Sequence, residues 1–398
     1  MTASPAAVTE RVHYLDNVRA LAMLLGLVFH GGLTYAAPSQ AVWIVSDWEG
    51  SRAIDAGIWL LHTFRMATFF LIAGYFAKLL VERRGVKGFL ANRFVRIVLP
   101  FILFYPVLLA GYVVAVVVAY SPALELLPPI MAENKLRPAP QGLNTMHLWF
   151  LYYLAFFSII AAVASQFPVT SFRRIVDRVF SSGAAVIAAP LLLVPALWMA
   201  GTPIPAIESF IPSLWPFGFY GLYFFAGWRL FSRESILDRL TPWLWPLLFV
   251  SGALYAVHYY LSPDLSELRR DPSLIGAASL WRQGVLAFLS AYLAAFLTLA
   301  SLLLGKRYLS GHSRVLRFLS DASYWIYLVH LPLILLIQGM LAPSHMSIWI
   351  KFPLSVALTF VLCLMFYASF VRYTPIGWML HGKKPFPWRP APAKNTAI

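Results

Sequence analysis

Apolar segments alternate with short polar connections along almost the whole chain. A helix needs roughly 20 mostly apolar residues to cross a bilayer core of about 30 Å. Ten segments approach or reach that length: 16–36, 57–78, 97–120, 147–166, 183–200, 214–231, 243–261, 281–304, 318–341 and 350–371. Prolines interrupt or border the fifth and sixth, where kinks or re-entrant stretches are compatible with the pattern. The pattern predicts an all-α polytopic membrane protein with about ten transmembrane helices.

Composition agrees with this fold class and excludes others. Of 398 residues, 60% are hydrophobic and 12% are charged, about half the roughly 25% charged fraction of soluble domains. The single cysteine cannot form an internal disulfide, and no internal repeat is visible. We predict one membrane domain over residues 1–380, followed by a basic, proline-rich and disordered tail over 381–398.

Basic residues gather on one side of the predicted spans. Of the 31 Lys and Arg residues, 22 fall in the N-terminus, the even-numbered connections and the tail, whereas 7 fall in the odd-numbered connections. The remaining two, Arg19 and Arg65, lie inside spans. Cytoplasmic loops carry the excess of Lys and Arg, so both termini are predicted to be cytoplasmic. Topology therefore accounts for the net charge of +15, and we expect no nucleic-acid partner.

Ionisable side chains inside spans are costly and need a partner, a cavity or a function. Four of them fall at similar depth in the outer half of the predicted spans: His30, His62, Arg65 and His147. His62 and Arg65, three residues apart, share one helix face, and His330 follows Tyr327 by three residues in the ninth span. One histidine alone is as well explained by a hydrogen bond between helices. Three histidines at one depth, together with the unpaired Arg65, favour a functional site.

A second polar cluster lies at the inner rim. Arg19, Arg93 and Arg96 stand at or near the cytoplasmic ends of their spans. The excess of positive charge on the inner side explains Arg93 and Arg96 by itself and is favoured by spacing alone. Three arginines at one rim would also suit a polyphosphate.

The two clusters together suggest group transfer across part of the membrane. An anionic cytoplasmic donor could dock at the arginines and extend a reactive arm toward the histidines. A histidine would then deprotonate a hydroxyl that attacks a thioester. Arg65 could stabilise the developing oxyanion or hold an anionic acyl group.

Four stretches, in chain order, resemble motifs of the acyltransferase 3 family of membrane O-acyltransferases: RALAMLLGLVFH at 19–30, FFLIAGYF at 69–76, RFVRI at 93–97 and SYWIYLVHLP at 323–332. The first has the family's arginine and histidine separated by ten residues. In the second, Ala73 replaces the usual serine, so a role for a hydroxyl at this position stays open. Each motif is loose alone, but the four in this order are specific.

A narrower resemblance is to the glucans biosynthesis protein C branch of that family. It rests on YLDNVRA at 14–20, MLLG at 23–26, HTFRM at 62–66 and HLWFL at 147–151. The resemblance implies a bacterial inner-membrane enzyme that transfers a succinyl group from cytoplasmic acyl-CoA to a periplasmic β-glucan. It also implies that His30 is the catalytic histidine and that Arg19, Arg93 and Arg96 bind the donor.

The remaining site residues are assigned less directly. For His62, Arg65 and His147, both catalysis and shaping of the pocket stay open. We place His62 and Arg65 beside His30 in the catalytic set. The acceptor pocket is assigned to four residues: His147, Trp149, Tyr327 and His330. For Trp149, a position in the aromatic belt at the membrane interface is the favoured alternative.

The predicted function is O-acylation of periplasmic glucans, with acyl-CoA as co-substrate, no permanently bound cofactor and no metal. The lipid bilayer is the surrounding partner, and a second copy or other glucan-synthesis proteins are candidate protein partners. One alternative is an O-acetyltransferase of another envelope glycan. A glycan exporter is an alternative of another class, although the chain lacks an inverted repeat and mid-membrane carboxylates. An inactive membrane partner of glucan synthesis is a third.

Overall fold

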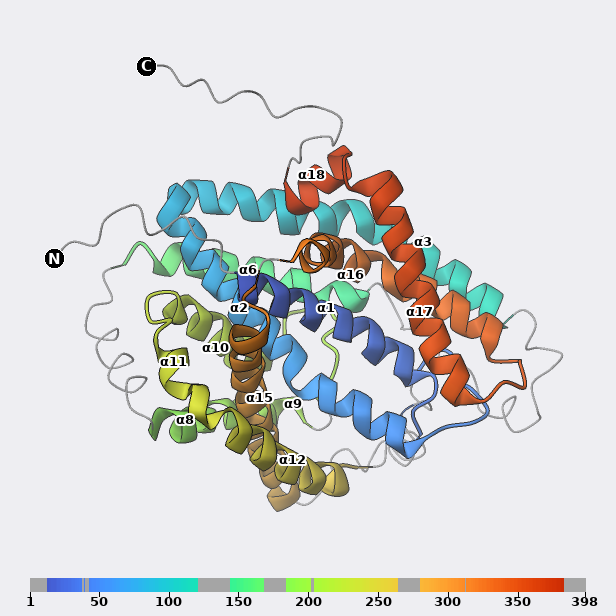
Figure 1. The fold of residues 1–398 in the computed structure, drawn as a ribbon, viewed down its shortest axis with the longest axis horizontal. Coiled ribbons are helices and arrows are strands. Elements are labelled where there is room, and N and C mark those ends of the chain that lie inside the picture. Colours follow the sequence, from blue (N-terminus) through green and yellow to red (C-terminus); the bar gives the residue numbers. More distant parts are fainter. Residues whose placement is uncertain are drawn as a thin grey trace, which may run out of the picture.

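The computed structural model describes residues 13–37, 39, 43–120, 144–167, 184–201, 204–263, 280–311 and 313–382. The regular elements among these residues are helices, and the one extended pairing among them is an isolated bridge between Ala36 and Ser51. The predicted all-α class is confirmed for this part of the chain (Figure 1). The predicted tail from 383 onward and most of the loops 121–146 and 262–280 lie outside the described residues.

Helices occupy every segment that was predicted to span. The elements are α1 His13–Leu33, α2 Arg52–Arg93, η3 Phe94–Val98, α3 Leu99–Tyr120, η4 Met146–Leu148, α6 Trp149–Ala164, α8 Ala184–Ala188, η5 Ala189–Leu193, α9 Val194–Ala200, α10 Trp215–Leu230, α11 Ile236–Leu240, η6 Thr241–Trp243, α12 Leu244–Leu261, α15 Leu280–Tyr308, α16 Arg314–Leu341, α17 Ile348–Phe366, η7 Tyr367–Val371 and α18 Pro375–His381. Within the described ranges, six helical segments are long and apolar enough to cross a membrane: Arg52–Val118, Met146–Ala164, Ile236–Leu261, Leu280–Tyr308, Arg314–Leu341 and Ile348–Val371.

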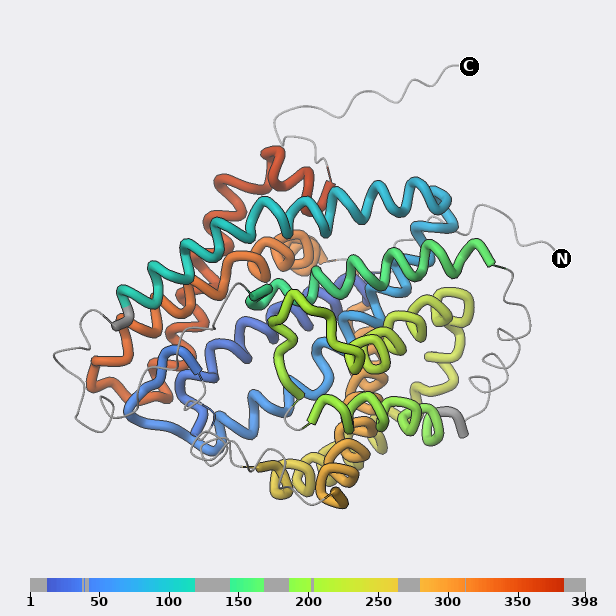
Figure 2. The backbone as a smooth tube through the Cα atoms, turned by 180° about the vertical axis from the view of Figure 1, so that it is seen from behind, coloured from blue at the N-terminus to red at the C-terminus, as the bar shows by residue number. Residues whose placement is uncertain are grey.

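The second and third predicted spans form one continuous helical segment. Residues 79–93, expected to form a connection, extend α2 instead because Lys, Arg, Glu and Leu are good helix formers. Gly85, with φ 67° and ψ 176°, is the only non-helical position inside α2; glycine adopts this conformation at no steric cost. The chain changes direction here, and α3 then runs along α16 (Figures 1 and 2).

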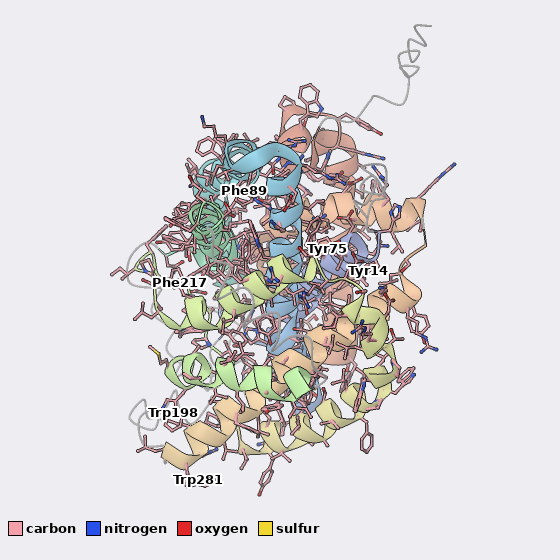
Figure 3. The ribbon with its side chains drawn as sticks, turned by 90° about the vertical axis from the view of Figure 1, so that its left-hand side faces the viewer. Tyr14, Tyr75, Phe89, Trp198, Phe217 and Trp281 are labelled. Atoms are coloured by element: carbon pink, nitrogen blue, oxygen red, sulfur yellow. The ribbon has the colours of Figure 1, made fainter. Side chains whose placement is uncertain are left out.

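α1 lies at the centre of the bundle, where it packs against α2, α15, α16 and α17. At one end of α1, the Glu234 carboxylate accepts hydrogen bonds from the hydroxyls of Tyr14 (2.9 Å) and Tyr75 (2.8 Å). Tyr14 belongs to α1 and Tyr75 to α2 (Figure 3). One carboxylate between α10 and α11 therefore holds the first two helices together.

α2 and α10 approach each other closely because each carries a glycine at the crossing. A Cβ atom on Gly74 would stand 1.8 Å from the Phe224 carbonyl oxygen, and one on Gly227 would stand 1.7 Å from that of Leu71. Small residues allow such backbone contact between membrane helices. This crossing fixes α2, which carries most of the site.

A buried ion pair anchors the loop that follows α1. Lys351 Nζ lies 2.8 Å from Asp47 Oδ2, and both side chains are 0% exposed. The sequence counted Lys351 only among the basic residues of the outer side; in the structure its side chain is buried with a carboxylate partner. The anchored loop brings the Trp43 ring parallel to His30, with the ring centroids 5.8 Å apart.

Candidate functional site

His30 and His330 form a directly hydrogen-bonded pair. The Nδ1 atom of His330 lies 2.7 Å from the Tyr327 carbonyl oxygen and 3.0 Å from that of Ile326. A carbonyl oxygen only accepts, so this Nδ1 carries the proton and the Nε2 of neutral His330 is an acceptor. His30 Nδ1, 2.8 Å from that Nε2, must therefore donate. The tautomer inferred from these partners leaves the lone pair of His30 on Nε2.

A proline in α16 explains the position of His147. Pro332 has no N–H, so the carbonyl of Leu328 lacks its helical partner. His147 supplies one, with Nε2 at 2.9 Å from that oxygen. In return, the Tyr327 hydroxyl donates to the His147 carbonyl at 2.8 Å. The turn before α6 thus packs on α16 beside His330. The ring centroids of His147 and His330 are 5.3 Å apart.

His62 and Arg65 contact one aromatic ring from α1. The Phe29 ring stacks on His62, with centroids 4.7 Å apart, and Arg65 Cζ lies 4.6 Å from the Phe29 centroid. His62 Nε2 is 2.9 Å from the Ile204 carbonyl oxygen and therefore donates to it. Its Nδ1 is then an acceptor, buried without a hydrogen-bond partner among the described residues.

Arg65 is a buried cation without a counter-ion in the part of the chain that the structure describes. Arg65 is 7% exposed, and its Nε has no hydrogen-bond partner among the described residues. The ion pairs of Arg19, Lys78, Lys306 and Lys351 join these residues to carboxylates elsewhere and do not include Arg65. Gly26 provides the room, because a Cβ atom there would stand 2.7 Å from Arg65 Nη1. A buried charge without a partner is expensive, which points to an anionic ligand.

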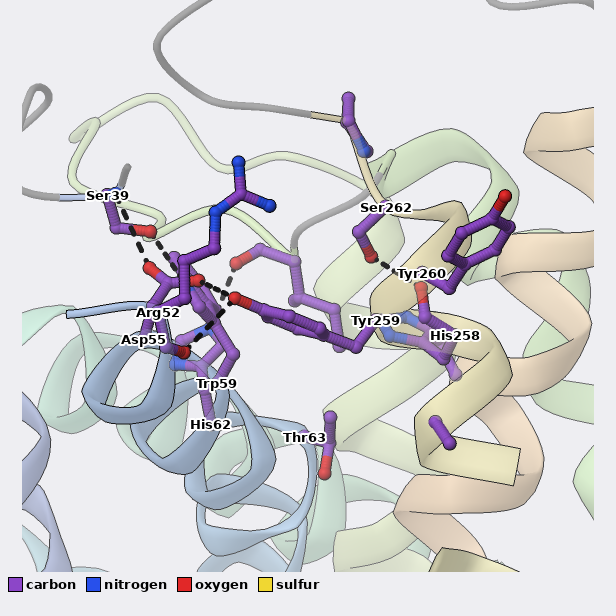
Figure 4. Close-up of a pocket in the computed structure, with 14 residues that line it drawn as sticks. Ser39, Arg52, Asp55, Trp59, His62, Thr63, His258, Tyr259, Tyr260 and Ser262 are labelled. Carbon is purple, nitrogen blue, oxygen red and sulfur yellow. Dashed lines mark hydrogen bonds between the residues drawn. The ribbon is translucent and has the colours of Figure 1, made fainter. Parts of the chain in front are cut away.

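Two cavities approach this layer from opposite ends of α2. The arginine cavity has a volume of about 380 Å³ and lies among α1, α2, η3, α6, α16 and α18. It is lined by Asp16, Arg19, Met23, Phe69, Ala73, Phe76, Leu79, Leu80, Arg83, Arg84, Asn92, Arg93, Arg96, Ile97, Phe150, Leu151, Leu154, Ser320, Asp321, Ser323, Tyr324, Leu380 and His381. The tyrosine cavity, of about 350 Å³, is lined by Ser39, Arg52, Asp55, Trp59, His62, Thr63, Ile204, Ala256, His258, Tyr259, Tyr260, Ser262, Pro263 and Ser290 (Figure 4).

Arg65 stands between the two cavities on α2. His62, three residues before it, lines the tyrosine cavity, and Phe69, four residues after it, lines the arginine cavity. Residues three and four apart share a helix face. With a rise of 1.5 Å per residue, the steps are about 4.5 Å and about 6 Å along the axis. Arg65 is therefore about one helical turn, along the axis of α2, from a lining residue of each cavity.

The arginine cavity contains all three arginines assigned to the donor from the sequence. It adds Arg83 and Arg84, which the sequence placed only as inner-rim charges. Arg19 is paired with Asp16 at 3.0 Å and lies over the Phe76 ring. Arg96 lies in the π-helical turn η3, a kind of turn that is frequent at functional sites. Five arginines and two aspartates leave the cavity strongly positive.

The structure thus brings together most of the predicted residues. His30, His147 and His330 form one cluster with Tyr327, and His62 and Arg65 adjoin it through Phe29, the neighbour of His30. Trp149 belongs to an aromatic group with Phe70 and Tyr220, which Phe150 connects to Tyr327.

Sequence reasoning missed the tyrosine cavity. From the sequence, Asp55 was counted only among the acidic residues of the outer side. No motif indicated His258 or Tyr259, which also line the cavity. The closest available signal was Asp55 itself, which lies two residues before the predicted second span and in the first turn of α2. Among the described residues, no group of three or more His, Cys, Asp or Glu side chains could hold a metal ion.

Comparison with known proteins places this geometry in a family. A family model described as an acyltransferase domain, acyltransferase 3, matches residues 12–368. Glucans biosynthesis protein C of Salmonella typhi and that of Salmonella heidelberg (strain SL476) are each 26% identical over 404 residues, which cover 97% of this chain and 97% of each relative. No solved structure matches. The chain belongs to the acyltransferase 3 family and is an acyltransferase.

Proposed function

We propose that this protein is a bacterial inner-membrane O-acyltransferase that moves a succinyl group from cytoplasmic acyl-CoA to hydroxyls of a periplasmic glucan. The name of its relatives, glucans biosynthesis protein C, supports the acceptor class. In this proposal ten helices cross the membrane, both termini are cytoplasmic, and the arginine cavity opens to the cytoplasm. The excess of Lys and Arg on that side supports the orientation.

The donor docks in the arginine cavity. Its phosphates interact with the guanidinium groups of the arginines that line the cavity. A guanidinium group donates two parallel hydrogen bonds to a phosphate. The cavity extends along α1 and α2 to Met23 and Phe69, in the direction of Arg65 and His30. A slender thioester arm follows this direction.

His30 is the general base. Its Nδ1 donates to His330, so Nε2 is free to take the proton of the acceptor hydroxyl. The hydroxyl oxygen attacks the thioester carbonyl carbon, the C–O ester bond forms, and the C–S bond breaks. The proton passes from Nε2 to the leaving sulfur. The products are the glucan ester and the free CoA thiol, so atoms and charge balance.

The observation that carries the succinyl assignment is Arg65, a buried cation without a counter-ion among the described residues, between the two cavities. A succinyl group ends in a carboxylate, which supplies that counter-ion. An acetyl group does not. The proposal therefore gives Arg65 the distal carboxylate and predicts a preference for succinyl over acetyl donors.

The test is thiol release from succinyl-CoA and from acetyl-CoA by the purified protein, with and without a soluble β-glucan. We expect release that requires succinyl-CoA and glucan, and a loss of about 10²- to 10⁴-fold in His30→Ala. His345→Ala, at an exposed position outside both cavities, is the matched control and should keep full activity. No turnover with either donor in folded protein would contradict the proposal, and a glycan exporter would give that result.

A further inference from the structure

We propose that the tyrosine cavity is the carbohydrate subsite that holds the acceptor glycan while it is acylated. This inference rests on the proposed function and adds to it a place and a set of residues. The acceptor pocket assigned from the sequence was a different group, around His147 and His330. In the structure those two side chains bind backbone carbonyls, and His330 also binds His30; neither lines this cavity.

The cavity lies between α2 and α12. Tyr259 extends from α12 toward α2, and its hydroxyl donates to Asp55 Oδ2 at 2.8 Å (Figure 4). On the other side, Trp59 Nε1 donates to Ser39 Oγ at 2.6 Å. Two aromatic side chains are thus held by hydrogen bonds at the rim of a cavity of about 350 Å³, within the range of small-molecule sites.

The chemistry of the lining favours a neutral polyol. Arg52 and Asp55 are its formal charges, one of each sign, whereas the arginine cavity is strongly positive. The remaining polar groups are mainly hydroxyls and imidazoles, which both donate and accept hydrogen bonds. A sugar presents hydroxyls at its edge and C–H groups on its faces. Aromatic rings with a polar end suit such a ligand.

The position of the cavity suits an acceptor. Its lining includes His62, and the Phe29 ring stacked on His62 belongs to the residue next to His30. The arginine cavity approaches the same layer from the other end of α2, with Arg65 between them. An acceptor in the tyrosine cavity and a donor in the arginine cavity therefore meet beside Arg65, each entering from its own end.

His62 gives this cavity an unsatisfied acceptor. Its Nε2 donates to the Ile204 carbonyl, and its Nδ1 is buried without a hydrogen-bond partner in the described part of the chain. Buried polar groups are nearly always paired. A sugar hydroxyl bound next to His62 would supply the missing donor, and the Phe29 ring that stacks on His62 also contacts His30.

The experiment compares two tyrosines on the same helix. Tyr259→Leu removes a ring that lines the cavity. Tyr255→Leu removes one that does not line it but also donates its hydroxyl to α2, at the Ala56 carbonyl. We expect Tyr259→Leu to raise the KM for a soluble β-gluco-oligosaccharide about tenfold, with little change in kcat or in the KM for succinyl-CoA. Tyr255→Leu should leave the glucan KM within about twofold.

Binding of the same oligosaccharide without donor, followed by calorimetry, separates the two proposals. Lost binding in Tyr259→Leu with normal binding in Tyr255→Leu supports the subsite even if no acyl transfer is seen, an outcome that contradicts the proposed function alone. Equal glucan KM values in the wild type and Tyr259→Leu, or equal increases in both variants, would overturn the subsite and leave the acyltransferase proposal standing. Asp55→Asn repeats the test if Tyr259→Leu does not fold.

Discussion

His147 donates its Nε2 proton to the Leu328 carbonyl, across 181 positions of sequence, at 2.9 Å. That oxygen is the one that Pro332 leaves without a helical N–H. The histidine therefore satisfies a proline-induced gap in α16, two residues from His330, the histidine that contacts His30. This contact assigns His147 to the support of the site rather than to the reacting atoms.

A double-mutant cycle tests that assignment. His147→Ala should lower the free energy of unfolding by about 1–3 kcal/mol, because a buried carbonyl loses its donor. In a Pro332→Ala background the residue at 332 regains an N–H, so the same change should cost about 1 kcal/mol less. Thermal unfolding of the four proteins in detergent measures the coupling. Additive effects would mean that the two residues do not share the Leu328 carbonyl.

How much of this could be predicted from sequence depends on the range of the interaction. The helix positions follow from the length of the apolar runs, a local property, and a helix lies in every predicted segment. The predicted connection after residue 78 is instead helical, and this difference has a local cause as well. The charged stretch consists of good helix formers, and the helix changes direction at Gly85.

The site could be predicted where the residue type alone makes a position inside a membrane span energetically unfavourable. A histidine or arginine inside a span demands a reason, and this reasoning grouped His30, His62, Arg65 and His147. Pairings were beyond it. Nothing local shows that Lys351 meets Asp47, 304 positions away, so the sequence counted it only among the basic residues of the outer side. The tyrosine cavity likewise depends on how α12 packs near α2, which no motif encodes.

His330 should act through His30. His330→Phe keeps an aromatic ring but removes the acceptor for His30 Nδ1–H, so the base is free to adopt either tautomer. We expect kcat to fall about 10²-fold, with both KM values nearly unchanged and a shifted pH–rate profile. Steady-state kinetics over pH measure this. His258→Phe loses its bond to Ser290 instead and should leave the pH profile unshifted; a shift in both variants would speak against a specific pair.

The crossing of α2 and α10 should not tolerate a methyl group. In Gly74→Ala the new Cβ would stand 1.8 Å from the Phe224 carbonyl oxygen, so the helices must separate. Overpacking of this kind costs about 1–3 kcal/mol or more. Gly57→Ala, in the same helix with no atom within 4 Å of its Cβ, should be neutral or stabilising by about 0.5–1 kcal/mol. The measurement is the thermal stability of both variants in detergent. Equal stability of Gly74→Ala and Gly57→Ala would contradict the close contact between Gly74 and Phe224.

Arg65 offers the sharpest test of the acyl group. If its guanidinium holds the distal carboxylate of a succinyl donor, Arg65→Met should reduce kcat/KM for succinyl-CoA far more than for acetyl-CoA, by an extra factor of about 10–100, the worth of a hydrogen bond to a charged group. Met is chosen because it fills the space beside Gly26 and Phe29 without charge. Thiol release with both donors gives the ratio, and Arg52→Met, a change at an exposed arginine of the tyrosine cavity, should not alter it. Equal losses with the two donors would instead assign Arg65 to the oxyanion, since that charge develops on the carbonyl oxygen whatever acyl group it belongs to.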